Sequence, residues 1–331
     1  RCSRDWSSDV CSSDLLNISM KICVVIPAYK VASTLAKVVS EIGPEVSNII
    51  VVDDNCPEKS GQVLQKQSND SRLEVIIRTQ NGGVGAAVKT DYEKAMQLGA
   101  DVIVKLDGDG QMPPARIKDL IEPIVSGKAD YAKGNRFFEV KEIKKMPKNR
   151  IFGNLVLSFM TKLSSGYWHI FDPNNGFTAI SRTTLQRLPI QKIDNRYFFE
   201  SDMLFRLNLN RAVVADVFMP AIYANEVSSL KIRKVLFEFP LKHFKNLLKR
   251  IIYSYYIREF NLASIELPTA IVLAVIGSVR AITAWNLSNQ TGQPTPAGTV
   301  VLSSILLLSA LQDRKSTRLN SSHGYISYAV F

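Results

Sequence analysis

Cysteine is scarce in this sequence, and the few cysteines present form no recognisable framework. The 331 residues contain four of them. Cys23 lies in an apolar run and Cys56 in a predicted loop, and the two lack the spacing of metal ligands. Cys2 and Cys11 belong to an N-terminal segment that differs from the rest of the chain. The pattern excludes a disulfide framework and favours a reducing compartment.

Several other signals are also missing. The chain has no internal repeat and no low-complexity linker, and the absence of G-x-x-x-x-G-K-[ST] excludes a P-loop ATPase. The segment NGGVGAAVK at 81–89 has the glycines of a dinucleotide loop, but Val88 replaces the third glycine. No acidic residue ends a strand at the right distance downstream, and this disfavours a Rossmann dehydrogenase.

The two ends of the chain differ from the rest. DVCSSDL at 9–15 and DRKSTRLNSSH at 313–323 have neither helical nor strand periodicity, and both resemble translated sequencing-adapter sequence. We therefore expect residues 1–19 to be non-native or disordered and residues 313–331 to be a non-native tail. The native chain should start near Met20, and its true C-terminus should be missing. Leaving out 1–15 and 313–331 changes the net charge of +11 by one unit, so the chain stays basic.

The first half of the chain alternates apolar, β-branched runs with segments of helical spacing. The runs lie at 21–29, 48–54, 73–79 and 101–109, and the helical segments at 33–42, 61–68 and 85–99. Continuous apolar runs are typical of strands that are buried on both faces. Their alternation with helices predicts a doubly wound, parallel, right-handed α/β sheet.

Four aspartates stand at the carboxyl ends of these predicted strands. Asp53 and Asp54 end the second run, and Asp107 and Asp109 end the fourth. Ligands of parallel sheets bind beyond this edge. Two carboxylates as close as Asp107 and Asp109 repel each other unless a cation lies between them. A solvated Asp-Gly turn is the alternative, but a diphosphate held by Mg²⁺ or Mn²⁺ explains the pair better.

Seven motifs, in order along the chain, carry a resemblance to a known family. They are VVIPAYK, VVDDNCPEKSG, NGGVGAAVKTDYEKAMQLGAD, LDGDGQMPP, GNRF, DPNNGF and FESDML. Residues 22–225 resemble family 2 glycosyltransferases with the GT-A fold, and most of all the dolichyl- or polyprenyl-phosphate sugar synthases. The resemblance implies a GT-A domain over 20–225 with a mixed, mostly parallel sheet. It also implies an inverting transfer of a hexosyl group from a UDP- or GDP-linked sugar to a polyprenyl phosphate.

The resemblance implies a donor site as well. Asp107, Asp109 and Gln111 would surround the metal and its diphosphate. The residues expected to bind the nucleotide-sugar are Pro27, Tyr29, Asp53, Asp54, Gly83, Lys89, Asp107 and Gly176. Of these, Asp53 and Asp54 would contact the nucleoside. Asp172 and Gly176 would shape the floor under the donor sugar, where a glycine allows close backbone approach.

Two arginines and two carboxylates would serve the acceptor. A phosphate is already an anion near neutral pH, so a polyprenyl phosphate needs cations to position it more than a strong base. Arg136 in KGNRF and Arg150 in PKNRIFGN match, by the resemblance, arginines that hold the acceptor phosphate. Glu200 and Asp202 are candidate catalytic bases, unless they only form an acidic helix start. His169, a lone histidine among aromatic residues, is interpreted as structural.

The last third of the sequence combines basic and apolar residues. Over 228–260, lysines and arginines are interspersed with Leu, Phe, Ile and Tyr at a helical spacing that Pro240 breaks. This pattern predicts basic amphipathic juxtamembrane helices over 226–264. Charge alone would also suit a nucleic acid, but no groove-reading or base-stacking module is visible, so we expect no nucleic-acid partner.

Two apolar segments follow, at 267–287 and 296–312. The first is long enough to span a bilayer, although Arg280 is costly there. Together they predict a two-helix transmembrane hairpin over 265–312 with a truncated second helix, and a buried hairpin is the alternative. The basic segment before it should be cytoplasmic, which places the catalytic domain at the cytoplasmic face of a membrane.

Two other functions stay open at this point. A family 2 glycosyltransferase that extends a polysaccharide or surface glycan would need a real base and would not need two placed arginines. A non-catalytic nucleotide-sugar-binding membrane protein would not need the intact aspartates, Gln111 and the Glu-x-Asp pair. The sugar and the base of the donor are not specified by the sequence, and an oligomer is possible.

Overall fold

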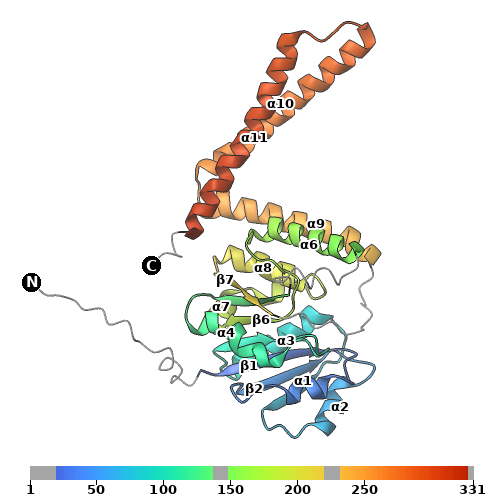
Figure 1. Cartoon of the computed structure of the whole chain (residues 1–331), viewed down its shortest axis with the longest axis vertical. Coiled ribbons are helices and arrows are strands. Elements are labelled where there is room, and N and C mark those ends of the chain that lie inside the picture. The colour runs from blue at the N-terminus through green and yellow to red at the C-terminus, as the bar shows by residue number, and fades with distance from the viewer. Residues whose placement is uncertain (1–19, 137–147, 220–231, 327–331) are drawn as a thin grey trace, which may run out of the picture. The chain divides into compact units, whose positions relative to one another are not determined.

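The computed structural model describes residues 20–136, 148–219 and 232–326 (Figure 1). For 148–152, 232–236 and 312–326 it describes the backbone alone. The chain forms two compact units, one that ends at Leu247 and one that begins at Leu248. The expectation for residues 1–19 falls outside the described residues.

A seven-stranded mixed sheet forms the centre of the first unit. Its order is β3-β2-β1-β4-β6-β5-β7. The strands are β1 (Ile22–Ala28), β2 (Asn48–Asp53), β3 (Leu73–Ile77), β4 (Val102–Lys105), β5 (Tyr131–Asn135), β6 (Thr178–Ser181) and β7 (Val214–Phe218). β6 runs antiparallel to β4 and β5, and all other pairs are parallel. The predicted mixed, mostly parallel α/β sheet is confirmed.

Helices cover both faces of this sheet. They are α1 (Leu35–Ser40), α2 (Ser60–Gln67), α3 (Val84–Gln97), α4 (Ile117–Val125), α7 (Arg182–Arg187) and α8 (Phe199–Leu209). Two further helices lie outside this layer: α6 (Lys148–Ser165) packs on α8, and α9 (Ile232–Ile252) contacts α6 and α8. Side chains alternate along β1, so Val24 and Ile26 pack with α1, α2 and α4, and Cys23 and Val25 pack with α3, α7 and α8. Each fully buried aliphatic side chain of this kind contributes about 1.5–3 kcal/mol.

The fourth strand is shorter than its apolar run. The run spans 101–109, but β4 ends at Lys105, and Leu106 makes one more backbone hydrogen bond, to Val25 O at 3.0 Å. Beyond it the chain turns, and Gly110 takes a left-handed conformation with φ +77° that suits glycine. Asp107 and Asp109 therefore lie in the loop past the carboxyl edge of the sheet.

The helix α9 is longer than the sequence pattern indicated. Pro240 was expected to break the helical spacing, yet α9 runs through it as one helix. A proline in a helix forfeits one backbone hydrogen bond. Here the side chains of the next turn hold the helix in place: His243 and Asn246 are buried against the first unit. These contacts, described below, offset the loss.

The second unit contains the helices α10 (Leu262–Thr291) and α11 (Ala297–Ile326), which pack against each other. Within the described residues, α10 is the one helix long and apolar enough to cross a membrane, and only 17% of that stretch is buried. The apolar part of α11, Ala297–Leu311, is shorter. Gly277 brings the helices close, because a Cβ there would lie 3.1 Å from Leu307. The helix α11 continues past residue 312 into the predicted non-native tail.

Candidate functional site

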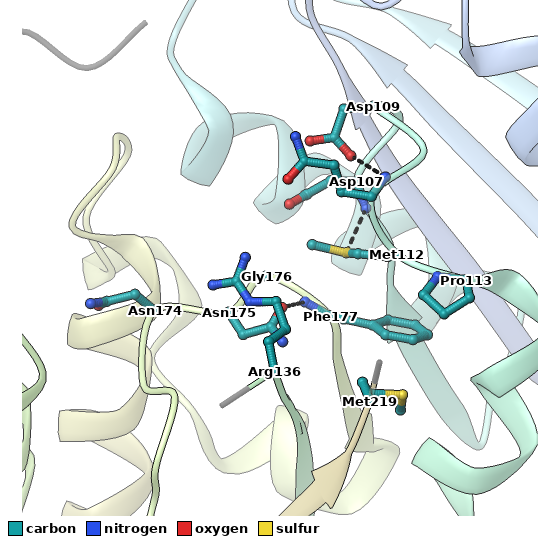
Figure 2. Close-up of a pocket in the computed structure, with 11 residues that line it drawn as sticks. Asp107, Asp109, Met112, Pro113, Arg136, Asn174, Asn175, Gly176, Phe177 and Met219 are labelled. Atoms are coloured by element: carbon teal, nitrogen blue, oxygen red, sulfur yellow. Dashed lines mark hydrogen bonds between the residues drawn. The ribbon is translucent and has the colours of Figure 1, made fainter. Parts of the chain in front are cut away.

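A pocket opens beyond the carboxyl edge of β4 (Figure 2). Four separate segments line it: the loop after β4, the end of β5, the loop before β6, and Met219 just after β7. They bring together five residues that were expected at the site from the sequence, namely Asp107, Asp109, Gln111, Arg136 and Gly176. The two carboxylates and the guanidinium therefore share one pocket.

A buried lysine contacts the first of these carboxylates. Lys105 Nζ lies 2.8 Å from Asp107 Oδ1 and 3.3 Å from Glu200 Oε1, and its side chain is 1% exposed. Burial lowers the pKa of Lys105, but the two carboxylates outweigh burial and hold the pKa above its ordinary value. Sequence reasoning missed Lys105, although a lysine inside an apolar strand two residues before Asp107 was a visible signal.

Gly176 fits tightly against this pair. A Cβ at this position would lie 2.5 Å from Asp107 Oδ2 and 2.7 Å from Lys105 Nζ, closer than real contacts allow. The carbonyl of Gly176 also accepts a hydrogen bond from Lys105 Nζ at 3.2 Å. A side chain at this position would have to displace the carboxylate of Asp107 or the ammonium of Lys105. The expected role of Gly176 in the floor of the site stays a prediction.

The carboxylates suit a divalent cation that is shared with a ligand. Asp109 Oδ1 accepts a hydrogen bond from the Gln111 backbone at 2.9 Å, which orients it at the pocket. Across the part of the chain that the structure describes, no three His, Cys, Asp or Glu side chains converge as a complete metal cage. Mg²⁺ is usually bound through one or two carboxylates plus substrate phosphates. Asp107 and Asp109 fit that kind of site.

A second buried lysine supports the floor loop. Lys133 on β5 is fully buried, and its Nζ donates to the Asn175 carbonyl. Burial lowers its pKa to about 8. The Asn175 side chain donates to Gly134 O at 2.7 Å and accepts from Phe177 N at 3.0 Å. These bonds fix the loop that carries Gly176.

Arg136 is held at the pocket wall by Asp172. Its Nε donates to Asp172 Oδ2 at 2.8 Å, and the Asp172 side chain is 3% exposed. The two residues come from the motifs GNRF and DPNNGF, which are far apart in the sequence. Arg150 lies in the first turn of α6, where only the backbone is described, so its expected place beside the acceptor phosphate stays a prediction.

The aspartate pair at the end of β2 is bonded to two loops. Asp53 accepts from the backbone of Cys56 and of Gly61, each at 2.7 Å, and it lines a second pocket with Cys56. Asp54 accepts from Gly83 N at 2.7 Å and is paired with Arg78. Both side chains are almost fully buried, and they fix the loops around the expected nucleoside site.

The other donor residues lie around this edge of the sheet. Pro27 is on β1, and Tyr29, just beyond it, is 46% exposed. Gly83 precedes α3 with φ +95°, a conformation that favours glycine. Lys89 donates to the Ile193 carbonyl, and to Asn195 Oδ1 at 2.7 Å. It therefore fastens α3 to the segment before α8.

Asp202 in the first turn of α8 has three hydrogen-bond donors around it. They are Asp194 N at 3.0 Å, Arg206 Nε at 3.1 Å and Asn246 Nδ2 at 3.0 Å. Both of its oxygens are engaged, and the residue is buried. A catalytic role for Asp202 stays a prediction, and the partner Asn246 on α9 was not found from the sequence.

His169 makes contacts that suit the structural role expected of it. Its Nε2 lies 2.9 Å from the Val214 carbonyl, and its ring packs edge-on against Tyr167 at 5.8 Å. Tyr167 in turn donates to the Ala212 carbonyl at 2.6 Å. These contacts fasten the segment after α6 to β7.

Comparison with known proteins identifies the family and supports the fold. The family model described as glycosyl transferase family 2 matches residues 23–188, half of the chain. The chain belongs to glycosyl transferase family 2. The recognised resemblance is confirmed, and the matched region holds Asp107, Asp109 and Gly176.

Several named proteins are similar in sequence to this glycosyltransferase. The UDP-N-acetylglucosamine–dolichyl-phosphate N-acetylglucosaminyltransferase of Methanococcus voltae is 32% identical, over 61% of this chain and 86% of its own length. The polyprenol monophosphomannose synthase of Mycolicibacterium smegmatis is 27% identical, over 59% and 74%. The dolichol-phosphate mannosyltransferase of Pyrococcus furiosus is 29% identical, over 70% and 64%.

A solved structure shares the fold of this glycosyltransferase. The glucosyl-3-phosphoglycerate synthase of Mycobacterium tuberculosis, crystallised with Mn²⁺ and UDP-glucose, matches with a TM-score of 0.53 at 19% identity. The match covers 70% of this chain and 79% of that one. At this identity the likeness shows a common fold.

Proposed function

We propose that this protein transfers a hexosyl group from a nucleotide-sugar to a membrane polyprenyl phosphate, with inversion at the anomeric carbon. The observation that carries the proposal is one pocket that holds both a carboxylate pair, Asp107 and Asp109, and an arginine, Arg136. The carboxylates suit a donor diphosphate with its metal, and the arginine suits a second anion. Relatives named for dolichyl or polyprenyl phosphate transfer support the same acceptor class.

On the donor side, Asp107 and Asp109 would hold Mg²⁺ or Mn²⁺, with Gln111 beside them. A bound divalent cation would act as a Lewis acid that neutralises the charge of the departing diphosphate. The protein itself orients the donor. Asp54 fixes the glycine loop at 81–85 by accepting a hydrogen bond from Gly83 N. Gly176 has no side chain, so it leaves the space beside Asp107 open for a sugar.

On the acceptor side, the anionic phosphate would be positioned by Arg136 and, from the first turn of α6, by Arg150. Arginine is suited to this task because its planar fork of donors matches phosphate oxygens. The acceptor arrives already deprotonated, so no general base has to be free. This agrees with the structure, in which Glu200 is paired with Lys105 and Asp202 has three donors.

The helix α9 supports a membrane location because it buries polar side chains against the protein and exposes large apolar ones. A surface helix of a soluble protein ordinarily does the opposite. Polar His243 and Asn246 face the protein and are buried. Phe237, Leu241 and Phe244, which share one helical face, are 80%, 70% and 56% exposed. Such an apolar face beside basic residues is typical of a helix that lies in a membrane interface.

The neighbouring helix and the second unit agree with this location. The helix α6 lies beside α9 (Figure 1), with Ser164 Oγ 2.8 Å from His243 Nδ1, and it exposes Leu155 and Phe159. In the second unit, α10 is long enough to span a bilayer. The basic residues before α10 favour the cytoplasmic face for the catalytic unit.

The test is direct. Membranes that contain the full chain are incubated with labelled UDP-glucose, UDP-N-acetylglucosamine or GDP-mannose and with undecaprenyl or dolichyl phosphate, and the lipid is extracted. We expect label in the lipid fraction from one donor, lost in excess chelator and in Asp109→Ala. Label found only in polysaccharide would contradict the acceptor, and undiminished transfer in chelator would contradict the metal.

A further inference from the structure

A buried ionic triad lies beneath the carboxylate pair. Lys105 Nζ bridges Asp107 Oδ1 and Glu200 Oε1 at 2.8 and 3.3 Å. The three residues come from β4, the loop after it and the first turn of α8. Lys105 is 1% exposed and Glu200 14% exposed, so the lysine cannot bind a ligand from solution.

The triad leaves the two oxygens of Asp107 in different surroundings. Lys105 engages Oδ1, while Oδ2 is the atom that a Cβ at Gly176 would meet at 2.5 Å. Asp107 is 30% exposed and lines the pocket. The ammonium group therefore restricts how this carboxylate can rotate, and it determines which oxygen is presented to a cation in the pocket.

We propose that Lys105 is a positioning residue that sets the orientation of the Asp107 carboxylate at the metal and donor site, and so turnover, with Glu200 as the counter-charge that holds the lysine in place. The inference rests on the proposed function, since it takes Asp107 as a ligand of the donor's divalent cation. It assigns Glu200 to Lys105 and not to proton abstraction. Its physical basis is that a buried ammonium needs more than one anionic or carbonyl partner, here Asp107, Glu200 and the Gly176 carbonyl.

The triad predicts opposite effects on cation affinity for its two outer members. Removing the positive charge of Lys105 makes the pocket more negative, so a divalent cation should bind as tightly or more tightly. Removing the negative charge of Glu200 leaves Asp107 as the one carboxylate that neutralises Lys105. Less negative charge then remains at the pocket for a cation, so the cation should bind more weakly. Turnover should fall in both variants, because Asp107 no longer has its set orientation. A purely structural role would lower affinity in both variants.

The experiment measures Mn²⁺ binding by electron paramagnetic resonance, in the presence of UDP, on the full chain in detergent. We expect Lys105→Met to keep or raise the Mn²⁺ affinity while kcat falls about 10- to 100-fold. We expect Glu200→Gln to lower the affinity about three- to thirtyfold, as loss of a nearby charge implies. The double variant Lys105→Met/Glu200→Gln should regain the wild-type melting temperature, since the charge that remains, on Asp107, is partly exposed to solvent, but not the wild-type kcat.

Lys37→Met serves as the matched control. Lys37 forms an exposed ion pair with Glu41 on α1, so Mn²⁺ affinity and kcat should both stay unchanged. If Lys105→Met does not fold, the inference is still tested by the change in Mn²⁺ affinity of Glu200→Gln and by the kcat of the double variant. Affinity shifts of the same sign in the two single variants, or full kcat in the double variant, overturn the inference. If wild type binds no Mn²⁺ with UDP, the proposed metal function itself fails, and that result is distinct from the other two.

Discussion

Arg136 and Asp172 form a two-point contact at the wall of the pocket. Arg136 Nε donates to Asp172 Oδ2 at 2.8 Å, and a second guanidinium nitrogen lies 3.4 Å from Asp172 Oδ1. Asp172 is nearly buried, whereas Arg136 is 31% exposed. A carboxylate behind the guanidinium fixes its plane before an anion arrives, which reduces the entropy lost on binding.

The first prediction concerns this arginine. Arg136→Gln should lower kcat/KM for a polyprenyl phosphate acceptor by about 30- to 150-fold, because a charge-assisted hydrogen bond left unmade costs about 2–3 kcal/mol. The measurement varies acceptor concentration at saturating donor. Arg116→Gln is the control, since Arg116 pairs with Asp119 on the surface of α4, and it should stay near wild type. If kcat/KM fell by the same small factor in both variants, Arg136 would not be part of the acceptor site.

The second prediction concerns Asp202. Asp202→Asn should lower the free energy of unfolding by about 1–3 kcal/mol, because it disturbs buried hydrogen bonds with Arg206 and Asn246. Turnover of the folded protein should change only a few-fold, since a phosphate acceptor needs no base. Urea unfolding and kcat are measured on the same preparation.

Asn246→Leu separates the two possible roles of Asp202. It removes one partner of the carboxylate and leaves the carboxylate in place, so it should reproduce part of the stability loss. A loss of about 10²- to 10⁴-fold in kcat for Asp202→Asn alone would indicate a general base. That result would favour an acceptor hydroxyl and a polysaccharide product over a lipid phosphate.

The sequence predicted the part of the site that is local in the chain. The runs at 21–29 and 48–54 mark strands because β-branched residues are continuous there, and a parallel sheet then brings Asp53 and Asp107 to one edge. The pairings of Lys105 with Glu200 and of Asp202 with Asn246 could not be predicted. Each joins residues more than 40 positions apart, and no local periodicity encodes such a contact.

The helix α9 also combines a local pattern that the sequence predicted with a long-range contact that it did not. Its helical spacing and its basic residues were visible in the sequence, but which face meets the protein was not. An apolar stripe ordinarily packs inward. In α9 the stripe of Phe237, Leu241 and Phe244 faces outward, because His243 and Asn246 find polar partners on α6 and α8. Only tertiary contacts reveal this choice.

The third prediction concerns Gly176. Gly176→Ala should reduce kcat about 100-fold or more, because its Cβ would lie 2.5 Å from Asp107 Oδ2 and displace the carboxylate. Gly153→Ala on α6 is the matched control, since nothing lies within 4 Å of a Cβ there. It should keep full activity and be slightly more stable, as expected for alanine in a helix. A fully active Gly176→Ala would show that the loop can move away from Asp107.

The fourth prediction concerns the pH dependence of stability and the histidine that α9 buries. His243 is 3% exposed, its Nδ1 lies 2.8 Å from Ser164 Oγ, and its ring packs on Phe198 at 4.8 Å. Burial lowers its pKa from 6.5 to about 4. The folded protein therefore resists protonation that the unfolded chain accepts, so stability is lost as the pH falls from about 6.5 towards 4.

This loss can be isolated with a variant that does not titrate. At about 1.4 kcal/mol per pKa unit, His243 accounts for about 2–4 kcal/mol of destabilisation between pH 7 and pH 4. His243→Asn should be less stable than wild type at pH 7, since it leaves a gap beside Phe198. It should lose about 2–4 kcal/mol less than wild type on acidification, as measured by urea unfolding at both pH values. A wild-type slope in His243→Asn would mean that another group carries the acid sensitivity.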